Sequence, residues 1–277
     1  MKKLTTLLAL SLFTAFPAFA SFAVDLPVVV HAQGATTVFY TSLDVSNHTN
    51  ATTTVMFEYI SSDLAVDANG TFPQLGPHGN FHTDDILGYL ASNGFITAAQ
   101  ASSGFGTMLI TFANPAFVTG NEASASARIY NYLNSGQTPS VGLAYRAAVL
   151  TLNGAHTVST VIQDTTTSGG GGPSISTNLG LEDVGIDDAG QVDTNPITIQ
   201  LTFYDPATGA QVGQQPTISL RSGQVTQINN VWAAYGIPTS THNVVAVATE
   251  TSGAAQIRGY VSLKDTSTND GSFFFMQ

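Results

Sequence analysis

A short stretch that occurs twice limits what this chain can fold into. It spans residues 75–89 and again residues 220–235, and the leucines and polar pairs of the two copies lie 145 positions apart. Each copy has a leucine, a glycine-bearing bend, alternating residues, a polar pair and a short apolar run. We interpret each copy as a strand that leads into one short helix. In the first copy, Thr83 or Asp84 is expected to cap the free N–H groups of that helix.

Alternating apolar and polar residues surround both copies. Residues 38–45 and 53–60 alternate with β-branched and aromatic side chains, and residues 197–205 repeat the pattern of the second of these segments. A period of two with such residues is typical of β-strands. The sequence therefore predicts an all-β fold made of two related antiparallel β-sandwich units, each with one short helix. Units of about 100–130 residues are typical of such sandwiches.

The predicted boundaries begin with an export signal. Residues 1–20 start with Lys2 and Lys3, continue as an apolar run and end in a small-x-small cleavage pattern, which is typical of a secretory signal peptide. The first sandwich unit is predicted over residues 21–152 and the second over 175–277. Residues 153–174, with their run of four glycines, are predicted to connect them. The protein is thus expected in the periplasm, on the cell surface or outside the cell.

The composition argues against several classes of partner. Without the signal peptide, 5 basic residues remain against 18 acidic ones, a net charge of −13. Nucleic acids and anionic membranes need neutralising Lys and Arg, so neither is expected as a partner. No stretch after the signal is long and apolar enough to span a membrane. The chain has no cysteine, so its stability must come from burial.

Several of these patterns also occur together in a known group of proteins. They are the valine-rich segment 28–31, the strand pattern of residues 40–47, and the two copies at 75–89 and 220–235. With these motifs the chain resembles the tandem β-sandwich domains of secreted bacterial proteins that have no established function. The resemblance covers most of residues 28–277. It implies a tandem pair of sandwich domains and no particular activity.

Two histidines form the densest cluster of candidate ligands. His78 and His82 are four residues apart. Positions i and i+4 share one face of a strand, so a two-histidine zinc site is geometrically possible. The second copy has no histidine at the equivalent place. The alternative is a polar loop that only leads into the helix.

An acidic segment in the second unit is a candidate calcium site. Its carboxylates belong to Asp183, Asp187, Asp188 and Asp193, with glycines between them. Calcium prefers six to eight oxygen ligands, and aspartates in a glycine-bearing loop can supply them. The alternative is a solvated acidic hairpin, since most charge runs only face water.

Three tyrosines on predicted strands are candidate contacts for a ligand. Tyr130, Tyr132 and Tyr260 could stack on sugars if they were exposed in a line, whereas inside the sandwich they would only fill space. Carbohydrate is the partner that this pattern suggests.

The sequence contains no nucleophile, metalloprotease, phosphate-loop or dinucleotide motif. We therefore expect a non-enzymatic, exported structural or interaction protein, for which adhesion and self-association are candidate roles. The alternative is a carbohydrate-binding module, with or without help from calcium. A buried carboxylate pair facing a cleft would revive an enzymatic reading.

Overall fold

The computed structural model describes seven stretches of the chain, and the predicted signal peptide lies outside them. These stretches are residues 21–33, 37–114, 121–132, 141–149, 154–165, 174–265 and 271–277. The described residues form an all-β fold of three antiparallel sheets with a few short helices. The predicted all-β class is therefore confirmed. The first unit departs from the predicted form, because its strands make one continuous sheet and it has two short helices where one was expected.

The first unit is built on one nine-stranded sheet with the order β4-β3-β6-β1-β2-β7-β8, in which β5 pairs with β2 and β9 pairs with β1. Two helices, α2 and α3, lie between β5 and β6 in the chain. The elements are β1 (Ser21–Gln33), β2 (Val38–Asn47), β3 (Thr54–Ser61), β4 (Asp67–Thr71), β5 (Asn80–Thr83), α2 (Ile86–Ser92), α3 (Ala98–Ala101), β6 (Ser103–Ala113), β7 (Ala123–Tyr132), β8 (Val141–Arg146) and β9 (Ala148–Val149).

The second unit has two sheets. One has the order β10-β16-β12-β13, with β14 paired to β12, and the other has the order β15-β11-β17-β18. The elements are β10 (Thr157–Gln163), β11 (Ile175–Asp187), β12 (Ile197–Tyr204), β13 (Gln211–Val212), β14 (Thr217–Leu220), β15 (Val225–Ile228), α4 (Val231–Tyr235), β16 (Asn243–Ser252), β17 (Ala255–Asp265) and β18 (Gly271–Phe275).

The two units repeat the same strand neighbours. The path β4-β3-β6-β1 of the first unit corresponds to β13-β12-β16-β10 of the second, and β5-β2-β7-β8 corresponds to β15-β11-β17-β18. In each unit the strand before the helix pairs with the equivalent strand, Leu43 facing Thr83 and Leu179 facing Ile228. Thr83 and Ile228 are 145 residues apart, so this shared topology supports an internal duplication.

Part of the predicted connection belongs to the second unit. Residues 157–163, inside the predicted range 153–174, form β10 and pair along their length with β16. Val158 and Ile162 are buried in the core of the second unit, so this segment has the apolar content that a connecting loop lacks. The glycine run at 169–172 lies outside the described residues.

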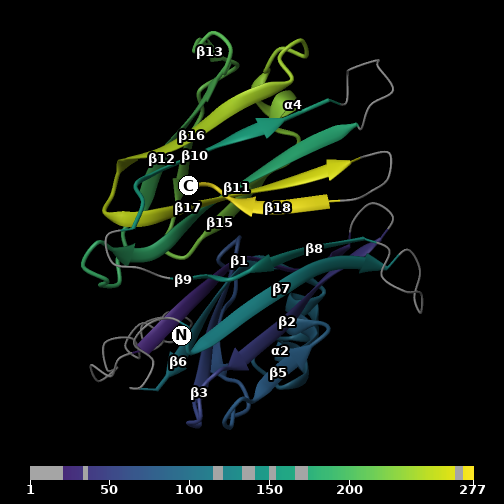
Figure 1. The fold of residues 1–277 in the computed structure, drawn as a ribbon, viewed down its shortest axis with the longest axis vertical. Helices are drawn as coiled ribbons and strands as arrows, with labels where there is room; N and C mark the ends of the chain where they lie inside the picture. The colour runs from purple at the N-terminus through teal and green to yellow at the C-terminus, as the bar shows by residue number, and fades with distance from the viewer. Residues whose placement is uncertain are drawn as a thin grey trace, which may run out of the picture.

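Each unit has its own core, and a smaller cluster joins them. Alternation buries Val55, Phe57 and Tyr59 in the first core, and the same pattern on β12 buries its apolar residues in the second. The third cluster contains Val28 of the first unit with Val225 and Tyr260 of the second. Figure 1 shows the two units stacked along the long axis, with β8 and β18 at their junction.

Candidate functional site

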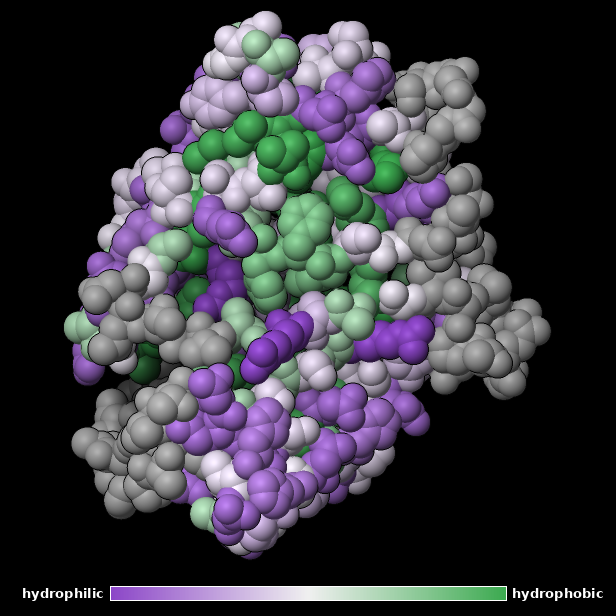
Figure 2. Space-filling view, viewed as in Figure 1, coloured by the Kyte–Doolittle hydropathy of each residue, from purple (hydrophilic) through white to green (hydrophobic). Residues whose placement is uncertain are grey.

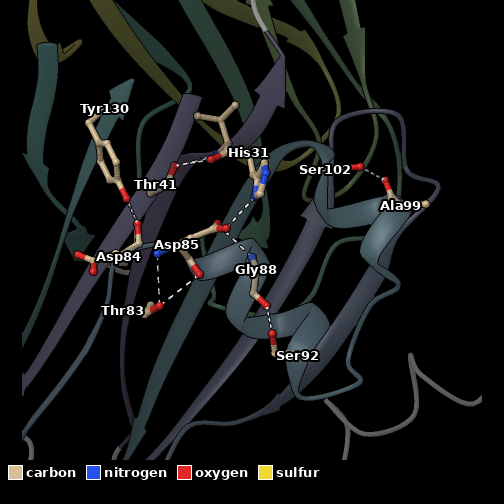
Figure 3. A network of polar contacts seen from close by, with 11 residues as sticks. His31, Thr41, Thr83, Asp84, Asp85, Gly88, Ser92, Ala99, Ser102 and Tyr130 are labelled. Carbon is tan, nitrogen blue, oxygen red and sulfur yellow. Dashed lines mark hydrogen bonds and ion pairs between the residues drawn. The ribbon is translucent and has the colours of Figure 1, made fainter. Parts of the chain in front are cut away.

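Both copies of the strand–helix stretch form as predicted, but the first cap is displaced by one residue. Asp85, instead of Thr83 or Asp84, is the N-cap of α2, and its carboxylate accepts the Gly88 N–H at 3.0 Å. Helix α2 begins at Ile86, so only the residue immediately before it can reach the first turn. Figure 3 shows Asp85 between this helix and β1.

Asp85 also ties the helix to the first strand of the unit. Its Oδ2 atom lies 2.8 Å from Nδ1 of His31, an ion-pair contact that lacks the direction of a hydrogen bond. On the other side of the helix start, the Tyr130 hydroxyl donates to the carbonyl of Asp84. Asp85 therefore links α2 to β1, and Asp84 links the start of α2 to β7. Both strands supply residues to the cavity described below.

The predicted zinc ligands have separate partners. The ring of His78 contacts Asn50 Oδ1 at 2.9 Å, whereas His82 contacts Asp44 at 2.8 Å and Asp84 at 3.2 Å. These contacts, chiefly the hydrogen bond to Asp44, raise the pKa of His82. The structure does not bring the two histidines to a common point, and a zinc site there stays a prediction without geometric support.

The acidic segment forms a hairpin that separates its four carboxylates. Ile186 bridges to Val192, and Asp187 accepts the N–H groups of Ala189 and Gln191 inside the turn. Asp188 is exposed and contacts the His156 ring at 3.0 Å.

Asp183 and Asp193, by contrast, are buried at the base of the hairpin. Burial, the largest influence, raises the pKa of Asp183 to about 7; the charges of Asp193 and Glu250 act in the same direction, and the hydrogen bond from the Gly185 N–H opposes the rise. Within the described stretches, no three histidine, aspartate or glutamate side chains are grouped to hold a metal ion. Calcium binding stays a prediction.

Two of the three candidate tyrosines, Tyr130 and Tyr260, are buried and not exposed. Tyr130 and Tyr260 are 6% and 1% exposed, and the Tyr260 hydroxyl donates to Gln227 Oε1 at 3.0 Å. The side chain of Tyr132 lies outside the described residues. Tyr130 and Tyr260 nevertheless come together, because both line one cavity at the junction of the two units.

This junction cavity is the candidate site. It has a volume of about 330 Å³, and apolar and aromatic side chains form most of its walls. The first unit contributes β1, β2, β6, β7 and β8, and the second contributes β11, β15, β17 and β18. Figure 2 shows apolar side chains gathered across the middle of the molecule over the second unit, with mostly polar side chains over the first. The apolar lining residues are Val28, Val30, Phe39, Phe105, Ile129, Leu143, Leu263 and Phe273.

Amide side chains and one amine add polar groups to the same cavity. They belong to Asn131, Asn178, Gln227, Asn229 and Lys264. Gln227 Nε2 donates to Asn229 Oδ1 at 2.7 Å, and Asn178 Oδ1 accepts the backbone N–H of Asn230 at 3.0 Å. Three of these polar groups, those of Asn178, Gln227 and Asn229, are therefore held in place at the strand–helix junction of the second unit.

The sequence analysis did not predict a buried charge cluster at the junction, formed by Asp25, Glu182 and Arg258. Nη1 of Arg258, in the second unit, contacts Oδ2 of Asp25, in the first unit, at 2.5 Å. Burial is the largest influence on both Asp25 and Glu182 and raises the pKa of each, while Arg258 opposes this rise. The sequence signal was an isolated aspartate inside an apolar strand, and its partner lies 233 residues away.

Comparison with known proteins identifies no relative from which the function of the site could be inferred. No protein-family profile matches the chain, and no curated protein is significantly similar to it. None of the helices that the structure describes has the length and apolar character needed to cross a membrane.

Proposed function

We propose that this protein is a non-enzymatic binding protein that acts outside the cytoplasm, and that the junction cavity holds its ligand. The observation that carries the proposal is the cavity itself, walled by apolar side chains of both units with a few amides among them. Ligand pockets are commonly clefts of about 300–1,000 Å³, mainly apolar, with a small number of placed polar groups. The cavity matches this description at its small end.

The walls of the cavity are fixed relative to one another. Thr107 donates to the Gly223 carbonyl at 3.1 Å, and Gln224 donates to the Ser62 carbonyl at 2.7 Å. Gly223 has a φ of 71°, a backbone conformation that strains other residues, and a β-carbon there would also meet the end of the Ile60 side chain of the other unit at 2.4 Å. A site built between rigidly joined walls binds without the cost of ordering them.

The carboxylates with raised pKa values support a binding role over a catalytic one. Asp25 and Glu182 share Arg258 in the junction, and Glu58 lies on β3 beside Asp67. None of them is among the residues that line the cavity, so no carboxylate with a raised pKa is placed to act on a molecule bound there. This supports the non-enzymatic proposal.

Binding of Nile red, a neutral apolar dye, tests the proposal on purified residues 21–277. The expected result is saturable binding at one site with a rise in fluorescence. Leu143→Trp fills the cavity from β8 and is expected to weaken binding at least about tenfold. Ser262→Leu fills it from the opposite wall and provides a second test if the first variant folds poorly.

The matched control is Ala144→Trp, which places the same indole on the opposite face of β8. It is expected to bind the dye like the unchanged protein. If neither cavity variant alters binding, or if the dye does not bind, the cavity is not the site.

Carbohydrate remains the second candidate ligand. Aromatic rings beside amides, here Tyr130 and Phe105 with Asn131 and Gln227, are a combination that also suits sugars. A glycan array, read in calcium and again in chelator, distinguishes this candidate. Saturable glycan binding that Leu143→Trp abolishes would favour it, and calcium dependence would direct attention to Asp183 and Asp193.

A further inference from the structure

The only lysine beyond the predicted signal peptide lies at the junction cavity. The whole chain has 7 basic and 18 acidic residues, and after Lys3 the next lysine is Lys264. Lys264 is exposed on β17 and lines the cavity. Among the described residues its amine forms no ion pair with a carboxylate.

The strands beside Lys264 leave room for its side chain. On β11 it faces Ser176, and on β18 it faces Gly271, so both neighbours across the sheet are small. A lysine can lay its apolar stem along such a surface and keep its ammonium group at the water boundary. The amine can therefore stand at the rim of the cavity.

Lys264 gives the lining of the cavity a positive charge, although the protein as a whole is acidic. No aspartate or glutamate is among its lining residues, although the chain carries a net charge of −11. Asn229 Oδ1 accepts from Gln227, which leaves the amide N–H groups of Asn229 as donors elsewhere in the lining of the same cavity. Ammonium and amide N–H groups together recognise an anionic oxygen, and charge-assisted hydrogen bonds are the stronger kind.

We propose that the junction cavity binds a small apolar molecule with an anionic head group, of the kind represented by a medium-chain alkyl carboxylate. The hydrocarbon would lie among Val28, Ile129 and Phe273, and the carboxylate would pair with Lys264. This inference rests on the proposed function, because it names the ligand class of the same site.

A matched pair of probes separates the charge from the hydrocarbon. Octanoate and octanol have equal chain lengths, and each is titrated against the Nile red complex of residues 21–277. Octanoate is expected to displace the dye at about tenfold lower concentration than octanol, a difference of the size that one charge-assisted contact provides. Isothermal titration of octanoate measures its binding without the dye.

Substitution of the lysine assigns the preference to its charge. Lys264→Gln is expected to weaken octanoate about tenfold and leave octanol unchanged, whereas Lys264→Arg keeps the preference. Arg221→Gln removes an exposed positive charge away from the cavity and is the control, expected to leave both probes unchanged.

The outcomes distinguish the two proposals. Equal affinity for octanoate and octanol, or a preference that survives in Lys264→Gln, overturns the anionic ligand and leaves the cavity as a binding site. Dye binding that Leu143→Trp abolishes, without displacement by either probe, overturns the alkyl carboxylate class alone. Failure of both the dye and direct octanoate titration overturns the proposed function as well.

Discussion

The two units share a strand order but differ in how their first strand is used. In the first unit, β1 pairs with β6 and, past an irregularity between Leu26 and Val29, also with β2, so that its strands form one continuous sheet. In the second unit, β10 pairs with β16, and β11 belongs to a separate sheet. The two units thus share a pattern of buried residues but differ in the connection between layers.

The N-caps of α2 and α4 also combine a shared feature with a difference. Both use a side-chain cap, but the backbone of the cap residue differs. Asp85 has an extended backbone, with φ −141°, while Asn230 adopts the left-handed region, with φ 49°. Both side chains accept an N–H from the first helical turn. Asparagine tolerates the left-handed region better than most residues, so the second copy reaches the same capping contact by another backbone route.

Loss of the arginine at the junction should have the largest effect, because it removes the cation of a buried charge cluster that joins the two units. Arg258→Met leaves Asp25 and Glu182 buried without their cation. We expect the free energy of unfolding to fall by about 3–5 kcal/mol, the usual cost of removing one partner of a buried ion pair. Urea denaturation followed by circular dichroism measures the change.

Two further variants control for this loss. Arg221→Met removes an exposed arginine and is expected to change stability by less than about 0.5 kcal/mol. Adding Asp25→Asn and Glu182→Gln to Arg258→Met removes the stranded charges and should restore part of the stability. A fall of under about 1 kcal/mol in Arg258→Met would mean that the cluster does not hold the units together.

A second prediction compares one carboxylate with a raised pKa in each unit, the half-buried Glu58 and the buried Asp183. Burial, followed by the charge of Asp67, raises the pKa of Glu58 to about 7, and burial raises that of Asp183 to about 7. Between about pH 4 and 7 the folded protein therefore holds protons that the unfolded chain has lost, so the free energy of unfolding falls as pH rises.

Glu58→Gln and Asp183→Asn remove this dependence one unit at a time. Each should stabilise the protein at pH 8 by about 1–3 kcal/mol and have little effect at pH 4. Urea denaturation across this range checks both. A variant equal to the unchanged protein at pH 8 would show that its carboxylate is not penalised by burial in that unit.

The caps should give the smallest effects and sharpen the comparison between the copies. Asp85→Ala should cost about 1 kcal/mol through the lost cap, whereas Asn230→Ala should cost about 2 kcal/mol because alanine also disfavours the left-handed backbone. Asn230→Gly keeps the backbone freely accessible and should cost less than Asn230→Ala. Thermal denaturation ranks the three variants. An equal fall in melting temperature for Asp85→Ala and Asn230→Ala would contradict the expected cost of the left-handed backbone at position 230.

The sequence predicted the local structure well because that structure depends on neighbouring residues. The alternation of Val55, Phe57 and Tyr59 defines a half-buried strand, and Gly236 ends α4 in the left-handed conformation typical of a helix terminus. The cap of α2 was misplaced by one residue because Asp84 and Asp85 have the same chemistry. Only the position of Ile86 in the folded helix distinguishes them.

The candidate site was harder to predict because it joins distant parts of the chain. Tyr130 and Tyr260 were named as ligand contacts, yet the expectation of an exposed line does not describe their surroundings. Alternation alone assigns a residue to a face of a strand and does not say which other sheet that face meets. Lys264 could have been noticed as the lone lysine, but its cavity exists only once the two units have packed.

The position of β18 makes the order of synthesis matter. This strand supplies Phe273, whose ring stacks on Tyr145 of the first unit with centroids 4.4 Å apart. A chain is made from its N-terminus, so the earlier unit can fold before β18 has been translated. Until then Tyr145 lacks the ring that stacks on it, and Leu143 lacks the wall that Phe273 supplies. A nascent chain that stopped short of residue 271 would carry a folded first half with one wall of the site missing.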